Sequence, residues 1–203
     1  MEAIAVAPVP KQQKKRSRKI PDALVYEIVD GKPIYYKGYR QVLNKKLNIE
    51  AVMAESSLQA WLKARLSHLL FNLLEQKGYE ILTGELGLLI GRGDRRGADL
   101  SIYRSDLLVL DAHFSKIPPE VIIEIDIQAD LENQNEMEYV LRKIEDYLRF
   151  GVKKVIWIFT SNRKIMTATS KKPWLTLDWD ATIETLEGAS FNLEKMLEGR
   201  QIG

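Results

Sequence analysis

Two strongly apolar segments and the helix between them constrain this chain most. Residues 120–128 (EVIIEIDIQ) and 153–160 (KKVIWIFT) each have the length and the β-branched content of a buried strand. Between them, apolar residues recur at helical spacing from Leu131 to Phe150, and Gly151 follows as a stop. This order predicts a βαβ crossover in which the two strands are parallel and the helix covers them.

Further strands and one more helix are expected around this unit. Two strand-like runs within residues 24–39 flank Asp30-Gly31, a dipeptide typical of a tight hairpin turn. Leucines at helical spacing predict a helix over residues 57–76, which a serine can cap and Gly78 can end. The other strand-like segments are residues 79–91, 98–104 and 164–169. We therefore expect an α/β (α+β) fold with a mixed central sheet flanked by helices and an N-terminal hairpin.

The composition fits one globular domain behind a basic tail. We expect a flexible tail at residues 1–20 and a single domain at residues 21–203. The net charge of +2 does not by itself indicate a nucleic-acid partner. The chain has no cysteine, which excludes disulfides, thiolate metal sites and cysteine nucleophiles. No apolar run is long enough to span a bilayer, so we expect a cytoplasmic protein without a membrane partner.

Lysines and arginines are concentrated at residues 11–19 of the tail, among them Lys14, Lys15 and Arg16. Such a run is either a solvated arm that aids solubility or an arm that binds phosphates. The second interpretation gains weight if the domain behind the tail acts on nucleic acid.

The strand at residues 120–128 carries two acids that a buried strand does not need. Because successive side chains alternate, Glu124 and Asp126 are expected on one face, with Gln128 further along it. Two like charges so placed repel each other unless a cation neutralises them. The alternatives are a half-exposed face of the sheet or a structural ion pair.

Lys143 lies on the apolar stripe of the helix that follows. It shares the i, i+3, i+4, i+7 spacing with Val140, Ile144 and Tyr147, so its stem would face the sheet. Its ammonium either pairs with the acidic strand or extends to the edge of the helix and to solvent.

Asp99 opens a strand directly after the glycine-rich loop GRGDRRG. If this strand neighbours the acidic strand, Asp99, Glu124 and Asp126 form a carboxylate cluster. Oxygen ligands without cysteine suit Mg²⁺ or Mn²⁺ rather than zinc. A nearby Lys143 would then orient the attacking water or stabilise charge on a phosphate. Taken alone, Asp99 also fits an ordinary turn.

The same loop contains Arg92, Arg95 and Arg96. These arginines either bind phosphates near the site or simply solvate the loop. The loop lacks the Lys-Ser/Thr pair of a P-loop, which excludes nucleotide hydrolysis by that motif.

Four strings stand in a recognisable order: Ala98-Asp99, PPEVIIEI with Glu124, the helical Lys143 to Tyr147, and GVKKVIW. This order resembles the PD-(D/E)XK nuclease superfamily, and more closely the Uma-two family of "putative restriction endonucleases". The likeness extends over residues 26–167 and includes the early hairpin YEIVDGKPIYY. It implies a restriction-endonuclease-like fold.

The resemblance also implies roles for single residues. Asp99 and Glu124 would hold Mg²⁺ or Mn²⁺, with Asp126 or the Ile125 carbonyl assisting, and Lys143 would act on the attacking water. Asp126 stands where the superfamily motif has its lysine, which this family supplies from the following helix. The second-rank candidates are Glu55 on the first helix, Gln128 and Tyr147.

We therefore expect a Mg²⁺-dependent endonuclease that hydrolyses phosphodiester bonds, in DNA rather than RNA, and that pairs as a homodimer. Asp126 in the lysine position motivates a second hypothesis, a protein of nuclease fold that binds nucleic acid without cutting it. A third is a structural protein in which a Glu124–Lys143 pair only fixes the core.

Overall fold

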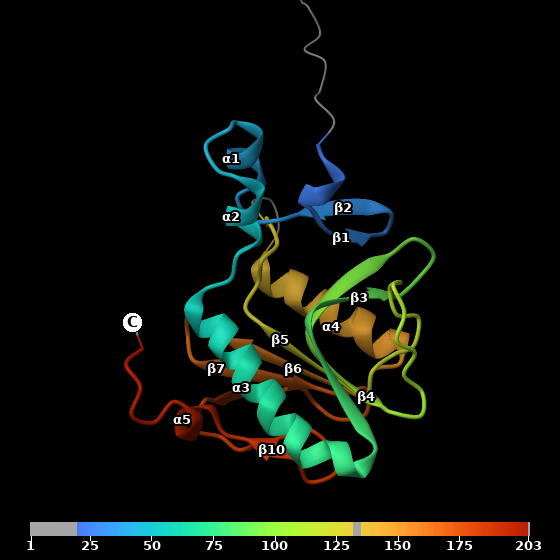
Figure 1. The fold of residues 1–203 in the computed structure, drawn as a ribbon, viewed down its shortest axis with the longest axis vertical. Coiled ribbons are helices and arrows are strands. Elements are labelled where there is room, and N and C mark those ends of the chain that lie inside the picture. Colours follow the sequence, from blue (N-terminus) through green and yellow to red (C-terminus); the bar gives the residue numbers. More distant parts are fainter. Residues whose placement is uncertain (1–19, 132–134, 203) are drawn as a thin grey trace, which may run out of the picture.

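A mixed eight-stranded sheet carries one long helix on each face (Figure 1). The computed structural model describes residues 20–131 and 135–202, so the basic tail with Lys14, Lys15 and Arg16 lies outside the described residues. The strands follow the order β2-β1-β4-β5-β6-β7-β8, and β3 pairs with β4. No helix within the described ranges is long and apolar enough to cross a membrane.

The bounds of the elements are as follows. The strands of the main sheet are β1 (Val25–Val29), β2 (Lys32–Tyr35), β3 (Tyr79–Leu89), β4 (Arg95–Arg104), β5 (Val121–Ile125), β6 (Lys154–Phe159), β7 (Lys164–Ala168) and β8 (Leu175–Asp178). A small second sheet contains β9 (Ile183–Glu184) and β10 (Ser190–Phe191). The helices are α1 (Tyr39–Leu43), α2 (Ile49–Met53), α3 (Ser57–Leu74), α4 (Glu136–Phe150) and α5 (Leu193–Met196), with 3₁₀ turns η1 (Asp22–Leu24) and η2 (Glu75–Lys77).

The predicted crossover and hairpin are confirmed. β5 and β6 pair in parallel, with Glu124 opposite Trp157, and α4 connects them across one face of the sheet. β1 and β2 pair antiparallel around Asp30 and Gly31, whose φ angles of 49° and 69° are both positive, as a tight hairpin turn requires. The expected mixed sheet flanked by helices is the observed architecture.

The two faces of β5 belong to two separate cores. Ile123 and Ile125 pack with the leucines of α3, while Ile122 packs with α4 and Trp157. This division follows from the alternation of side chains along a strand. The central strand is therefore buried on both faces, and the polar group of Glu124 lies on the α4 side.

The start of α3 is fixed by a capping box. The Ser56 side chain accepts a hydrogen bond from the Gln59 backbone, and the Gln59 side chain accepts one from the Ser56 backbone. The expected serine cap is thus confirmed. The helix gives way to the 3₁₀ turn η2 before Gly78, which has φ +81° and ends the segment as predicted.

Three element boundaries differ from the expectation. β4 begins at Arg95 instead of residue 98, because its first residues pair with β3 and β1. β5 ends at Ile125, so the acidic strand does not continue to Gln128. α4 begins at Glu136, where Asn135 caps it through bonds from the Met137 and Glu138 backbone. The short helices α1 and α2 were not expected.

Candidate active site

The site lies where β4 and β5 separate. The ladder between these strands includes Leu100 opposite Ile123, and the next residues in register are Asp99 and Glu124. There Asp99 Oδ2 accepts a hydrogen bond of 2.7 Å from the Ile125 backbone. The carboxylate thus replaces a strand carbonyl. The charge of Asp99 also adds to the raised pKa of Glu124, so the two acids predicted as metal ligands are near each other.

The first of two ionic clusters contains Asp99, Lys63 and Glu55. The Lys63 ammonium lies 2.6 Å from Asp99 Oδ1 and also forms an ion pair with Glu55. Burial alone would lower the pKa of Lys63, but Asp99 and Glu55 outweigh burial and raise it. Glu55, a second-rank candidate in the sequence, is therefore connected to Asp99 by a shared ion-pair partner. That partner, Lys63, was not among the residues predicted from the sequence.

Glu85 lies at the edge of this first cluster because β3 contains a bulge. The pairing of β3 with β4 shifts between Thr83 and Leu86, opposite Asp99, and Gly84 and Glu85 have φ angles of +97° and +58°. Bulges of this kind often redirect a side chain beside a functional site. Burial raises the pKa of Glu85, and Asp99 and Glu55 add to this shift, whereas the bond from the Tyr36 hydroxyl and the charge of Lys63 oppose it.

The second cluster is centred on Lys143 and lies under α4. Its ammonium is 3.1 Å from Glu124 Oε1 and 2.9 Å from Glu27 Oε1, and the side chain is 1% exposed. The Tyr147 hydroxyl lies 2.5 Å from Glu124 Oε1 and 2.6 Å from the Gly97 carbonyl. The predicted Glu124–Lys143 contact and the placement of Tyr147 beside it are thus observed.

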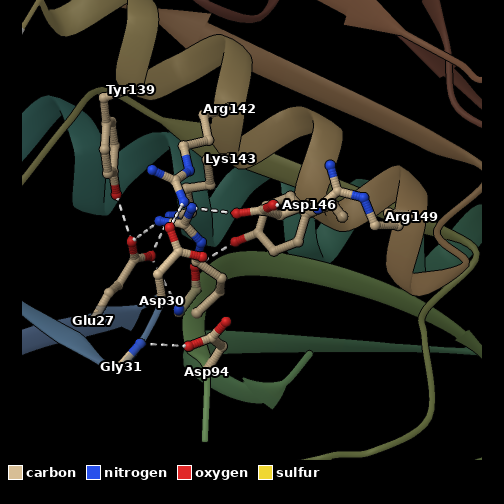
Figure 2. A network of polar contacts seen from close by, with 12 residues as sticks. Glu27, Asp30, Gly31, Asp94, Tyr139, Arg142, Lys143, Asp146 and Arg149 are labelled. Atoms are coloured by element: carbon tan, nitrogen blue, oxygen red, sulfur yellow. Dashed lines mark hydrogen bonds and ion pairs between the residues drawn. The ribbon is translucent and has the colours of Figure 1, made fainter. Parts of the chain in front are cut away.

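Glu27 is the residue that the sequence analysis missed. It comes from β1 and, besides Lys143, receives a bond from Arg96 Nη1 at 2.7 Å. The Tyr139 hydroxyl also donates to it at 2.7 Å (Figure 2). Burial alone would raise the pKa of Glu27, but Lys143 and Arg96 outweigh burial and lower it. The sequence signal that could have identified Glu27 is a single acid in the strand of the hairpin, among the apolar residues Val25, Tyr26 and Ile28.

Arg96 corrects an expectation. Its side chain is fully buried between Glu27 and Asp146, so it cannot bind a phosphate without breaking two internal ion pairs. The reason is that Arg96 belongs to β4 instead of to a loop. Arg92 and Arg95 remain exposed, the first in the turn before β4 and the second at its start.

Asp126 also lies away from its expected position. The strand ends before it, its φ is +60°, and its carboxylate accepts bonds from the Thr160 backbone and hydroxyl. The expectation that Asp126 shares a face with Glu124 is therefore wrong. Gln128 likewise lies outside the two clusters. Its backbone carbonyl accepts a hydrogen bond from the Lys37 backbone.

The pKa of Glu124 is raised, as is that of Glu85. Burial raises the pKa of Glu124 to about 7, and the charges of Asp99 and Glu27 add to this, while Lys143 and the Tyr147 hydroxyl oppose it. Lys143 has two carboxylates around it, which outweigh its burial and hold its pKa well above the usual value. The single ammonium does not fully compensate both acids. Burial thus disfavours the charged form of Glu124, and a further cation beside it would favour that form.

These donors fit a hard cation in their chemistry. Asp99 and Glu124 supply carboxylate oxygens at the same end of the sheet, and a cation beside Glu124 would favour its charged form. Among residues 20–131 and 135–202, however, no three Asp, Glu or His side chains already lie close enough together to hold a metal ion. Each of the two carboxylates instead has a lysine partner, Lys63 at Asp99 and Lys143 at Glu124.

Comparison with known proteins adds a family and a fold. The model of the Uma2 family, described as "Putative restriction endonuclease", matches residues 48–198. The crystal structure of a "putative nuclease belonging to DUF820" from Anabaena variabilis superposes with a TM-score of 0.63 at 14% sequence identity. The match covers 84% of this chain and 88% of that one, and at this identity it shows a shared fold. A search of curated proteins gives no match.

Proposed function

Because the chain belongs to the Uma2 family, we propose that it is an endonuclease that hydrolyses phosphodiester bonds in DNA with Mg²⁺ or Mn²⁺ as cofactor. The observation that carries the proposal is the position of Asp99 where β4 and β5 separate, bonded to the Ile125 backbone beside Glu124, with Lys143 against Glu124. The family description and the fold of the Anabaena protein support a nuclease; the metal and the preference for DNA are our inference.

Asp99 and Glu124 would hold the ion, which when bound would polarise the phosphate and lower the pKa of the attacking water. Asp126 is left out of this set, because Thr160 occupies both of its carboxylate oxygens. The Ile125 carbonyl follows Glu124 directly in the sequence and accepts a bond from the Gln59 side chain at 3.3 Å.

Lys143 acts in this proposal as a positioning residue. It is buried and engaged by two carboxylates, so it orients Glu124 rather than contacting the substrate. Tyr147 completes the arrangement. A hydroxyl has only one proton to donate. In this proposal the Tyr147 hydroxyl donates it to the Gly97 carbonyl when Glu124 is protonated and to Glu124 when the carboxylate is charged.

A cavity of about 600 Å³ borders both clusters and offers an approach for the substrate. Its lining includes Glu27, Glu85, Arg95 and Phe114. The Arg95 guanidinium lies 5.7 Å from the centre of the Phe114 ring, and both side chains are exposed. An exposed arginine beside an aromatic ring suits a phosphate and an adjoining base. Asp99, Glu124 and Lys143 line neither this cavity nor a larger one of about 850 Å³ beside α4, and only the smaller one includes Glu27 and Glu85.

The test is nicking of supercoiled plasmid by the purified protein, with Mg²⁺, with Mn²⁺ and with a chelator. We expect metal-dependent nicking that falls by about 100-fold or more in Asp99→Asn and Glu124→Gln, and by about 10–100-fold in Lys143→Met. Glu145→Gln, an exposed change on the same helix as Lys143, is the control and should cleave like the parent. Nicking that survives all three site changes would exclude the proposed site.

One observation favours a second function, binding without cleavage. Each proposed ligand already has an internal lysine partner, as in a site that has lost its metal. Such a protein would bind DNA with a steep dependence on salt and would not nick plasmid with either metal. The homodimer stays a prediction.

A further inference from the structure

Lys63 lies where a cation ligated by Asp99 would have to bind. Its ammonium is 2.6 Å from Asp99 Oδ1, while the other oxygen of Asp99 is held by the Ile125 backbone at 2.7 Å. Both oxygens of the proposed ligand are therefore engaged. A second cation at Oδ1 would stand within a few ångströms of the ammonium and be repelled by it.

Glu55 gives the ammonium a second partner on the outer side of the cluster. The Glu55 side chain is 23% exposed and that of Asp99 is 9% exposed, so the Lys63 ion pairs lead from the interior toward solvent. Lysine has a flexible four-carbon stem with three rotatable donors. The ammonium can therefore leave Asp99 and remain paired with Glu55.

We propose that Lys63 is an internal competitor for the divalent ion, which holds Asp99 in the metal-free protein and moves to Glu55 when the ion binds. The proposal rests on the proposed function, because it concerns the same Asp99. Its consequence is a moderate affinity for metal. The ion must displace an ammonium from Asp99, so the site fills only when the concentration of free metal is high enough to win this competition.

The test is calorimetric titration of Mn²⁺ into the parent protein and into Lys63→Gln. The glutamine amide can still donate to Asp99 but carries no charge, so we expect the Mn²⁺ affinity to rise by at least about tenfold. Lys171→Gln, the same change at an exposed position outside both clusters, should leave the affinity unchanged. Adding Asp99→Asn to Lys63→Gln should abolish the gain.

A second variant keeps the test decisive if Lys63→Gln folds poorly. Lys63→Arg retains the positive charge, and it should bind Mn²⁺ no more tightly than the parent. In thermal unfolding, Mn²⁺ should stabilise Lys63→Gln more than it stabilises the parent. Unchanged or weaker Mn²⁺ binding by Lys63→Gln, or tighter binding by Lys63→Arg, would overturn the proposal.

The nicking assay separates this proposal from the proposed function. A tighter Mn²⁺ site in Lys63→Gln, with no nicking by any variant, would support the competition and refute the endonuclease. Nicking by the parent with unchanged Mn²⁺ affinity in Lys63→Gln would support the endonuclease and refute the competition.

Discussion

At the scale of single residues, the most informative group is Glu124, a buried carboxyl in contact with Lys143. Burial raises its pKa to about 7, which means that its charged form is disfavoured in the folded protein. The unfolded chain loses the same proton near the ordinary value of 4.5. Between these two pH values the folded state binds more protons than the unfolded state, so stability falls as pH rises from about 4.5 to about 7.

Glu124→Gln should therefore stabilise the protein at pH 8, because it removes a charge that burial disfavours. The gain in free energy of unfolding is at most about 3 kcal/mol at pH 8 and should shrink toward zero near pH 4.5, where the native glutamate is neutral. Urea unfolding of both proteins at a series of pH values measures this difference.

A lower stability of Glu124→Gln at pH 8 would contradict this account. It would show that the charged Glu124–Lys143 pair stabilises the core, which is the structural role considered from the sequence. Glu145→Gln, exposed on α4, is the matched control and should change stability by only a few tenths of a kcal/mol.

The sequence predicted the residues on regular elements better than those at element ends. Alternation along β5 and the helical stripe of α4 were enough to bring Glu124 and Lys143 together. The predicted position of Asp126 was wrong, because the positive φ angle of this residue ends the alternation of side chains after Ile125. Lys63 was not found, because a lysine on a leucine-rich helix gives no sign that its ammonium will reach Asp99.

At the scale of elements, the N-terminal hairpin is part of the candidate site. β1 supplies Glu27, which receives both Lys143 and Arg96 in a fully buried position. The hairpin signal in the sequence was correct, but it gave no reason to connect the hairpin with the site. That connection depends on the pairing of Ile28 with Arg95, between strands more than sixty residues apart in the chain.

Glu27→Gln should destabilise the protein strongly, because it removes the charge between two buried cations. We expect a loss of about 3–5 kcal/mol in the free energy of unfolding, measured by urea denaturation at pH 7. Glu50→Gln on the exposed surface of α2 is the control and should be close to the parent. A loss below 1 kcal/mol for Glu27→Gln would show that the hairpin does not hold Lys143 and Arg96 in place.

β4 shows why a glycine-rich string was misread. GRGDRRG has the composition of a loop, yet its last three residues pair with β3, and Arg95 also pairs with β1. Tertiary pairing outweighs local propensity at such positions. The same pairing buries Arg96 and leaves Arg95 exposed.

At the scale of the whole molecule, the sheet separates two clusters that meet only at its end. Lys63 comes from α3 on one face and Lys143 from α4 on the other, while Asp99 and Glu124 belong to the adjacent central strands (Figure 1). The mixed sheet and its two covering helices followed from the sequence. The division of the charges between the two faces did not, because it depends on the separation of β4 and β5.

Anomalous scattering from a crystal soaked in Mn²⁺ tests the central claim most directly. The account predicts one strong peak in contact with both Asp99 and Glu124, with the Lys63 ammonium moved from Asp99 to Glu55. The peak should be absent from Asp99→Asn crystals soaked in the same way. A parent crystal with no peak at these carboxylates, or with Lys63 still bound to Asp99 beside a peak elsewhere, would contradict it.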